Sequence, residues 1–587
     1  MNYLFYNRDK TPFFSVGGQV HNSSTYSEET MQRAWKAARA LGLNTVAAPV
    51  CWNLLEPEEG IYDYSQTDML LRQAKAYGMR LILLWFGSWK NGASQYIPVW
   101  MRTQKERFRW VQTIQHFETR VLSPHCEENR QADARAFSKL LGYLKSHDTE
   151  GIVAGVQIEN EPGQIGTPRD YSDIGERAYI SQVPEEVMRW LRESCQGINR
   201  NFNSAGNTGI HPGKKPGIPG TAQVREIWME NGGRTEGTWE EVFGFHAAEI
   251  CTAYAFAVYI NSISAAGKRE YAIPTYVNVW LGEMYNRVAG IDYPSGGATS
   301  RVLDLWKRFT PDIDALCPDV YYNDYLMYGD ICEKYAGPDN PLYIPESGAT
   351  AMNAVNTFRG IVEFGLCGIH CFGIDSLIDP EGKFKPGVQE YANMVRIVRA
   401  AAPLIQKYQG TGRLYAVTQY EGSAFDYIDF GDFIGRVVCT NPLGDAYASD
   451  TRPYMDAAHT EEEHYKVRGK GLIVYEGNGS FYLAGEGFRL NLIRKDTIEG
   501  MTTGVRTSNF QNLRHQEYLE VAEGHFEADM RFVTDRLRTG DECDHGLWVH
   551  SDVGIVHALL EMGGNPHNPK EYSAPRDARG LPEEGLT

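Results

Sequence analysis

The chain has 587 residues, of which 42% are hydrophobic, 12% aromatic and 22% charged. This composition is that of a globular protein and excludes a disordered or fibrous one, and the length predicts about two or three domains. The net charge of −18 disfavours nucleic acids and membrane surfaces as partners, because an acidic protein is repelled by their phosphate groups.

The ten cysteines are scattered along the chain, and several stand in apolar runs where a thiol acts as a small hydrophobe, among them Cys51, Cys317, Cys367 and Cys371. A reducing compartment is therefore expected. The N-terminus has no basic segment followed by an apolar one, and no stretch looks long enough to span a bilayer. We expect a cytoplasmic protein.

Between residue 12 and about residue 400, short apolar runs alternate with helical patterns, which is typical of parallel βα units. Eight strands are expected, at residues 13–21, 43–52, 80–89, 152–161, 272–280, 313–322, 342–348 and 367–375. Eight such units predict an α/β fold, a (β/α)₈ TIM barrel, in which catalytic groups stand at the carboxyl ends of the strands.

The helix between the first two strands has clear boundaries. Ser27 is a suitable N-cap, Met31, Trp35 and Leu41 recur at helical spacing, and Gly42 is a suitable end. The same order of helix, glycine and strand recurs at Gly78.

The connection after the fourth strand is long, running from residue 162 to residue 271. Its part at 201–220 is rich in Gly, Pro and Asn and is expected to be irregular, either as a lid or subunit contact at the active-site mouth or as a surface loop. Residues 245–268 then predict one long buried helix.

Beyond residue 405 the pattern changes to period-two strands with tight turns, and Gly-Asn-Gly within residues 471–493 predicts a hairpin. We expect a catalytic barrel at 1–405, a β-rich, sandwich-like accessory domain at 406–564 and a polar, Pro-containing tail at 565–587.

The clearest chemical signal is Gln-Ile-Glu-Asn-Glu-Pro at 157–162, where an apolar strand ends abruptly in carboxylates and an amide. Alternation along a strand places Glu159 and Glu161 on one face, and only one of them is expected to reach a substrate. Glu346 ends the seventh strand in the same way. Glycoside hydrolysis needs two such carboxyl groups, one protonated and one ionised, on either side of the scissile bond.

These residues resemble glycoside hydrolase clan A, and within it family 35, the β-galactosidase family. The resemblance covers the barrel and is carried by Gln-Ile-Glu-Asn-Glu at 157–161, by the glutamate of strand seven and by Trp-Asn-Leu-Leu-Glu-Pro-Glu-Glu-Gly at 52–60. It implies that Glu161 is the acid/base and Glu346 the nucleophile. For Glu56 it implies a substrate contact, while an ion pair that fixes the loop is an equal alternative.

The chain departs from the better-known family members at two places. Pro162-Gly163 replaces Tyr-Gly after the acid/base, and Leu-Trp-Phe-Gly-Ser-Trp at 84–89 replaces Cys-Ala-Glu-Trp after strand three, a region that helps to bind the sugar. The β-rich C-terminal part resembles the accessory domain of a bacterial branch of family 35 that includes exo-galactosidases acting on fragments of plant polysaccharides.

Supporting residues follow from the resemblance and from the strand ends. Asn160 is expected to bind the sugar's 2-hydroxyl, and Tyr321, favoured over Tyr322, to donate to the nucleophile and keep it ionised. Further candidate sugar contacts, with packing as an equal alternative for each, are Trp85, Trp89, Asn278 and Trp280.

We expect a retaining exo-glycoside hydrolase that releases a terminal β-linked sugar, most simply β-D-galactose, from small oligosaccharides or glycosides. The alternatives are an exo-hydrolase for glucosamine or arabinopyranose and a catalytically silent carbohydrate-binding barrel. No metal site and no cofactor are implied. A homo-oligomer is compatible with the long loop and the accessory domain.

Overall fold

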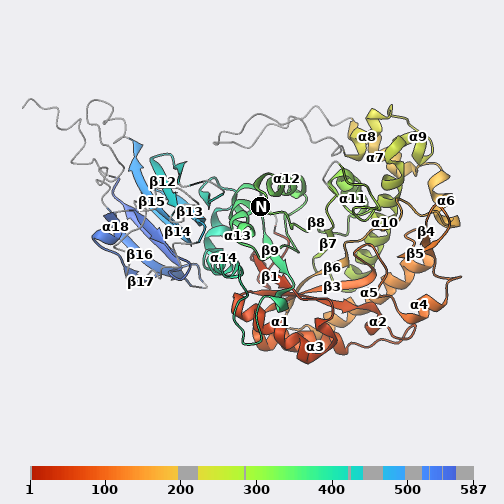
Figure 1. Cartoon of the computed structure of the whole chain (residues 1–587), viewed down its shortest axis with the longest axis horizontal. Coiled ribbons are helices and arrows are strands. Elements are labelled where there is room, and N and C mark those ends of the chain that lie inside the picture. Colours follow the sequence, from red (N-terminus) through yellow and green to blue (C-terminus); the bar gives the residue numbers. More distant parts are fainter. Residues whose placement is uncertain are drawn as a thin grey trace, which may run out of the picture.

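The computed structural model describes residues 3–195, 223–282, 286–420, 423, 425–439, 467–495, 518–527, 529–544 and 546–562. Its N-terminal part is a (β/α)₈ barrel, and its C-terminal part consists of two antiparallel sheets (Figure 1). The polar tail predicted at 565–587 lies outside the described residues.

The barrel wall is a parallel sheet with the strand order β8-β7-β6-β3-β2-β1-β9. Its strands are β1 (Ser15–Gln19), β2 (Thr45–Cys51), β3 (Arg80–Lys90), β6 (Val153–Asn160), β7 (Thr275–Val279), β8 (Ala315–Pro318) and β9 (Gly368–Phe372). The eighth wall segment, at 342–347, joins both edges through isolated parallel bridges, Ile344 to Ile369 and Ser347 to Val320. All eight predicted strand positions are thereby confirmed as parts of the wall, the seventh in irregular form.

The predicted helix boundaries in the first two βα units are confirmed. Helix α1 (Glu28–Leu41) begins after Ser27, whose side chain accepts a hydrogen bond from the Thr30 N–H at 3.2 Å, and it ends at Gly42, where φ is 75°. Helix α3 (Ser65–Tyr77) ends at Gly78 with φ of 64°. Glycine is suited to both ends because it adopts this left-handed conformation without a Cβ clash.

The remaining barrel helices cover the outside of the sheet or fill the loops at its carboxyl edge (Figure 1). They are α2 (Trp52–Leu55), α4 (Val99–Thr103), α5 (Glu127–His147), α11 (Leu303–Phe309), α12 (Tyr325–Tyr335), α13 (Ala351–Glu363), α14 (Gln389–Ala400) and α15 (Ala402–Tyr408). The sequence patterns did not predict the hairpin between α4 and α5, formed by β4 (Trp110–Gln112) and β5 (Glu118–Leu122).

The long connection after β6 is largely helical where it is described, while residues 201–220 lie outside the described part. It contains α6 (Asp173–Ile180), α7 (Glu185–Cys195), α8 (Val224–Glu230), α9 (Trp239–Phe243) and α10 (Ala247–Glu270). Helix α10 confirms the predicted buried helix. Contrary to the expectation from sequence, the run Trp239–Glu270 is long and apolar enough to cross a bilayer, but 72% of its most apolar window is buried inside the fold, where α10 packs along α5.

The C-terminal part has a six-stranded sheet, in the order β10-β13-β14-β19-β16-β17, and a four-stranded sheet, in the order β11-β12-β15-β18, counted over the described residues. Their bounds are β10 (Leu414–Thr418), β11 (Phe425–Asp429), β12 (Phe433–Cys439), β13 (Lys470–Gly477), β14 (Ser480–Glu486), β15 (Phe488–Arg494), β16 (Tyr518–Phe526), β17 (Phe532–Leu537), β18 (Leu547–Val549) and β19 (Ile555–Leu560). Side chains of both sheets, such as Phe481 and Leu490, share one apolar cluster, as in a sandwich.

The predicted Gly-Asn-Gly hairpin joins β13 to β14, with positive φ at Asn478 (51°) and Gly479 (76°). The six-stranded sheet also packs on the barrel. Lys470 on β13 is fully buried, and its Nζ lies 3.0 Å from Glu390 of α14 and 2.6 Å from Glu486 of β14. Leu472 and Val474 extend the apolar core of the barrel across this contact.

Candidate active site

Polar side chains gather where the barrel strands end, at the carboxyl edge of the sheet. Asn160 is the last residue of β6, Glu161 follows it, and Asn278 is near the end of β7. Asp319 follows β8, and Glu346 stands in the wall segment beside it. All five side chains are buried. The structure thus brings together residues that are up to 186 positions apart in the chain.

Glu346 is held by three donors. Asn160 donates from Nδ2 to Oε1 at 3.1 Å, Asn278 donates from Nδ2 to the same oxygen at 3.4 Å, and Tyr321 donates from its hydroxyl to Oε2 at 2.8 Å. Burial of the hydroxyl end and the Glu346 charge raise the pKa of Tyr321, so this phenol keeps its proton and remains a donor. Three donors around an acceptor-only group are the surroundings of an ionised carboxylate.

Glu161 has the opposite electrostatic setting. Burial, followed by the negative charge of Glu346, raises the pKa of Glu161 to about 8, while the Lys90 ammonium opposes this rise. The backbone of Glu161 is left-handed, with φ of 46°, and its N–H donates to Oδ1 of Asn278 at 2.8 Å. Glu161 is therefore protonated at neutral pH and is suited to give a proton to a leaving group.

Two residues of this cluster escaped the sequence analysis as site residues. Asp319 accepts a hydrogen bond from Nδ2 of Asn278 at 2.7 Å, and its pKa is raised by burial and by the charges of Glu346 and Glu161. Lys90, the last residue of β3, is buried and donates from Nζ to Oδ1 of Asn160 at 2.8 Å and to Asn91. A charged residue at the end of an apolar strand was the available signal for both, as it was for Glu161.

Glu159 turns away from this cluster. Its carboxylate accepts the backbone N–H of Ser88 at 3.0 Å and that of Trp89 at 2.6 Å, at the end of β3. Its φ of 62° is left-handed, like that of Glu161, so the strand alternation on which the prediction of a common face rested breaks here. Of the two, Glu161 lies in the cluster and Glu159 does not, because the left-handed backbone at both residues sends their side chains in different directions.

Three predicted sugar contacts are placed elsewhere. Glu56 is almost fully buried and accepts hydrogen bonds from Nε1 of Trp52 at 2.8 Å and from the Gly60 N–H at 2.9 Å, so it fixes its own loop, by hydrogen bonds and not by the ion pair considered from sequence. Trp85 is fully buried and donates to Asp133 of α5, and Trp89 packs on Phe256 and Tyr259 of α10.

The physical reason is the same for both tryptophans: strand β3 faces helices on its outer side, and a large apolar ring gains most by burial there. Asn278, also predicted as a sugar contact, lies in the cluster and donates to Asp319 and Glu346. Trp280, just after β7, is half-buried and stays a candidate sugar contact.

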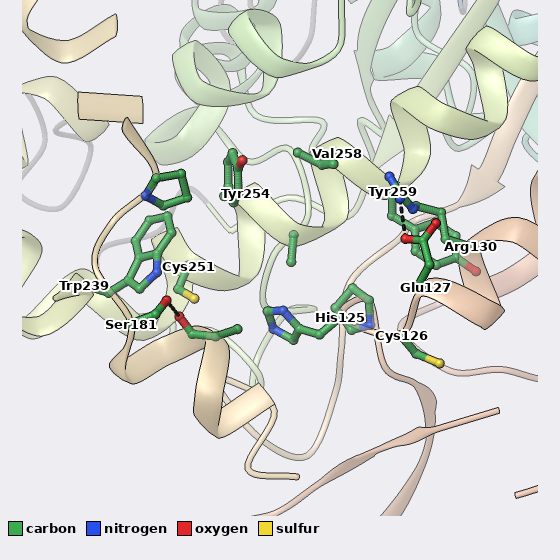
Figure 2. A pocket seen from close by; sticks show the side chains of 14 residues that line it. His125, Cys126, Glu127, Arg130, Ser181, Trp239, Cys251, Tyr254, Val258 and Tyr259 are labelled. Atoms are coloured by element: carbon green, nitrogen blue, oxygen red, sulfur yellow. Dashed lines mark hydrogen bonds and ion pairs between the residues drawn. The ribbon is translucent and has the colours of Figure 1, made fainter. Parts of the chain in front are cut away.

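A cavity of about 280 Å³ lies outside the cluster, between the start of α5, the end of α6 and helix α10 (Figure 2). His125, Trp239, Cys251 and Tyr254 line it. None of the predicted site residues is among its lining residues. Within the part of the chain that the structure describes, no group of three or more His, Cys, Asp or Glu side chains is arranged to hold a metal ion.

Two family models match the chain. Residues 6–212 match "Glycosyl hydrolases family 35", and residues 391–550 match a domain of unknown function, DUF5597. The first match includes Glu161 and ends before Glu346. The N-terminal part of the barrel is therefore similar to family 35, and the C-terminal sheets lie in a match to a domain without an assigned role.

The curated relatives are similar over part of the chain. A "Beta-galactosidase" of Xanthomonas manihotis is 28% identical over 183 residues, 30% of this chain and 28% of that protein. "Beta-galactosidase 8" of Oryza sativa subsp. japonica is 28% identical over 173 residues, 28% of this chain and 23% of that protein. The match thus spans less than a third of either relative.

Among solved structures, the β-galactosidase of Bacillus circulans sp. alkalophilus aligns with a TM-score of 0.45 and 13% identity over 68% of this chain and 57% of that one. The catalytic domain of a β-amylase of Paenibacillus polymyxa aligns with a TM-score of 0.45 and 11% identity over 65% of this chain and 98% of that one.

Proposed function

We propose that this chain, a glycoside hydrolase whose residues 6–212 match family 35, releases a terminal β-linked galactose with net retention of configuration. The observation that carries this proposal is the contrast between two buried carboxyl groups in one cluster. Burial and a neighbouring negative charge raise the pKa of Glu161 to about 8, whereas Glu346 accepts three hydrogen bonds.

In the first step of this mechanism, Oε2 or Oε1 of Glu346 attacks the anomeric carbon while the bond to the leaving oxygen breaks and Glu161 gives that oxygen its proton. In the second step, Glu161, now ionised, takes a proton from water, and the water oxygen displaces Glu346. Asn160 lies beside Glu346 and can meet the 2-hydroxyl of the sugar, a contact that strengthens as positive charge develops on the ring.

The proposal of galactose rests on the curated relatives, both of which are named β-galactosidases. The structure offers one argument on the glucosamine alternative. The Lys90 ammonium lies 2.8 Å from Oδ1 of Asn160, the side chain expected next to position 2 of the sugar. A glucosamine unit carries its own ammonium at that position, so like charges would meet in a buried site. Neutral galactose and arabinopyranose have no such conflict.

The experiment that tests the sugar and the stereochemistry is a panel of 4-nitrophenyl glycosides, with proton NMR of the first product anomer. We expect the β-galactoside to be hydrolysed fastest and the β-anomer of galactose to appear first. Faster hydrolysis of the arabinopyranoside would identify arabinopyranose, and not galactose, as the preferred sugar. If the α-anomer appeared first, retention of configuration would be contradicted. Sugar binding without any hydrolysis would support the silent binding barrel instead.

The nucleophile is tested by Glu346→Ala. We expect turnover to fall at least about 10⁴-fold, since a covalent step is lost, and added azide to restore it by forming the α-galactosyl azide. The matched control is Glu333→Ala, an exposed glutamate on α12, which should keep full activity. If Glu346→Ala keeps ordinary activity without azide, Glu346 is not the nucleophile.

A further inference from the structure

A second concave site lies in the connection between β3 and α5. It is a groove of about 600 Å³, whose walls come from the loop after β3, from α4 and from the β4–β5 hairpin. Its lining includes Ala93, Arg102, Lys105, Trp110 and Arg120. The loops that follow barrel strands form the face on which catalysis takes place, so this groove belongs to the active-site face.

The groove is basic, although the chain as a whole has a net charge of −18. Arg102, Lys105 and Arg120 line it together with one acidic residue, Glu118, which pairs with Lys105. Arg102 and Arg120 form no ion pair with any other residue that the structure describes. Arg102 donates from Nη2 to the backbone carbonyls of Ser94 at 3.1 Å and Gln95 at 2.8 Å, which leaves its other N–H groups for a ligand. Burial, and then the like charge of Arg120, lowers the pKa of Arg102. Two neighbouring guanidinium groups without a counter-ion favour an anionic ligand between them.

A short turn connects this groove to the carboxylate cluster. The Lys90 N–H donates to the Ala93 carbonyl at 2.8 Å, and the Ala93 N–H donates back at 3.1 Å. Lys90 thus starts the turn inside the cluster, with its ammonium on Asn160, and Ala93 ends the turn in the wall of the groove. The turn therefore connects the cluster directly to the wall of the groove that holds the two arginines.

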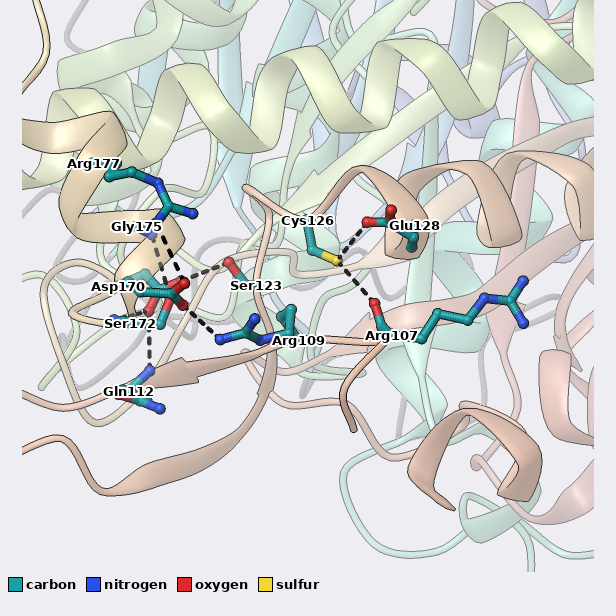
Figure 3. A network of polar contacts seen from close by, with 11 residues as sticks. Arg107, Arg109, Gln112, Ser123, Cys126, Glu128, Asp170, Ser172, Gly175 and Arg177 are labelled. Carbon is teal, nitrogen blue, oxygen red and sulfur yellow. Dashed lines mark hydrogen bonds and ion pairs between the residues drawn. The ribbon is translucent and has the colours of Figure 1, made fainter. Parts of the chain in front are cut away.

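The hairpin that carries Arg120 is held firmly by a buried carboxylate (Figure 3). Asp170 accepts the Gln112 N–H at 3.0 Å, the Ser123 hydroxyl at 2.5 Å and the Ser172 hydroxyl at 2.9 Å, and so ties both strands' ends to the loop before α6. The walls of the groove are therefore in place before a ligand arrives, which lowers the entropic cost of binding.

We propose that this groove binds an anionic sugar unit, carrying a carboxylate or a sulfate ester, in the part of the substrate that remains after the terminal sugar leaves. This inference rests on the proposed function and names its substrate class: acidic oligosaccharides. The planar guanidinium groups of Arg102 and Arg120 match the two oxygens of a carboxylate or sulfate group, and the ring of Trp110 lines the wall beside them. The overall negative charge disfavours nucleic acid as the natural ligand.

Calorimetric titration of the full chain carrying Glu346→Ala, which cannot cleave its ligands, tests this assignment with three trisaccharides: tri-galacturonate, a sulfated β-galactotriose and neutral β-galactotriose. At low salt we expect at least one anionic trisaccharide to bind about tenfold more tightly than the neutral one, and the better of the two to identify the anionic group. High salt should reduce the difference, because the groove is open to solvent and its charges are screened. Equal binding of all three would overturn the proposal.

Variants separate the groove from the catalytic cluster. Arg120→Glu reverses one exposed charge and should reduce binding of the anionic trisaccharide about tenfold or more, with Arg102→Ala as a second variant. The matched control is Arg269→Ala at the end of α10, which precedes β7 and so lies at the opposite face of the barrel. Unchanged anion binding in Arg120→Glu and Arg102→Ala would overturn the proposal.

Hydrolysis of 4-nitrophenyl β-galactoside, which carries no anionic sugar, should be unchanged in Arg120→Glu. If the wild type hydrolyses this substrate but shows no preference for anionic trisaccharides, the proposed hydrolase activity is supported and the proposed groove is contradicted. If the protein hydrolyses nothing but binds anionic trisaccharides in a way that depends on Arg120, the groove is supported and the hydrolase activity is contradicted. Equal competition by a DNA oligonucleotide would contradict the assignment to a glycan.

Discussion

At the scale of single residues, the acid/base candidate is a compromise between chemistry and stability. Glu161 is useful as a proton donor because its carboxyl group keeps its proton up to a pH of about 8. The same burial and the same neighbouring charge make its ionised form unfavourable in the folded state. The catalytic setting of Glu161 should therefore be visible in the pH dependence of folding.

For Glu161→Gln we expect a gain in stability, relative to the wild type, that grows with pH. Between pH 4.5, the ordinary pKa, and about 8, the folded wild type holds a proton that the unfolded chain has lost. Wild-type stability therefore falls as pH rises through this window, by up to about 1.4 kcal/mol per pH unit for one proton, whereas glutamine has no proton to lose. Urea denaturation of both proteins from pH 5 to pH 8 measures this difference, and a difference that stays constant over the range would contradict the raised pKa.

Lys90 partly opposes the rise in the pKa of Glu161 through its positive charge. Its ammonium stabilises ionised Glu161 and also holds Oδ1 of Asn160, so that Nδ2 of Asn160 faces Glu346. In Lys90→Met, the upper limb of the pH profile of kcat/KM should move to higher pH, and kcat should fall about tenfold as Asn160 loses its orientation. Lys139→Met, an exposed residue on α5, is the control. If kcat falls but the upper limb of the kcat/KM pH profile stays at the same pH, Lys90 does not act on the pKa of Glu161 and has a packing role only.

At the scale of elements, the βα order was predictable because each barrel strand is a short apolar run and its helices end at glycines such as Gly42 and Gly78. Glu161 and Glu346 could be predicted from the same pattern, since both end apolar runs. The outward direction of Trp85 and Trp89 could not, because it depends on Asp133 and Tyr259, which belong to helices far along the chain.

The β4–β5 hairpin also escaped prediction, because β4 has three residues and β5 has five, and its stability comes from tertiary contacts more than from its own pattern. Asp170 supplies several of these contacts. In Asp170→Ala we expect hydrogen exchange of the hairpin amides to accelerate strongly, by the equivalent of about 3 kcal/mol for the lost hydrogen bonds, while β1 to β3 are unaffected. Asp173→Ala, which removes the partner of Arg109 at the surface, should change little. Unchanged exchange in Asp170→Ala would show that packing holds the hairpin by itself.

At the scale of the whole molecule, the six-stranded C-terminal sheet shares the barrel's apolar core. Leu472, Val474 and Ala484 of β13 and β14 belong to the same cluster of buried residues as the barrel strands, and Asn393 of α14 donates to Glu486 at 2.8 Å. The contact is therefore a packed interface, and we expect the two parts to unfold together.

Lys470→Met tests this interface, because Lys470 is fully buried between Glu390 and Glu486. The methionine fills a similar volume but leaves Glu486 buried without its counter-charge, so a loss of about 3–5 kcal/mol is expected. Lys407→Met, which breaks an exposed pair with Glu476, should cost less than about 1 kcal/mol. Calorimetry should show one unfolding transition for the wild type and an earlier or split one for Lys470→Met, and equal losses in the two variants would contradict a structural role for the buried ion.

The left-handed backbone at Glu159 and Glu161 also bears on how such an enzyme can evolve. Few side chains tolerate this conformation, with Gly, Asn and Asp the main exceptions, so most mutations at either position disturb the chain path as well as the carboxyl group. Drift at the strand end is therefore confined to a narrow set of sequences. Loop positions with ordinary backbone angles carry no such restriction, and substitutions there can direct the same chemistry to new substrates.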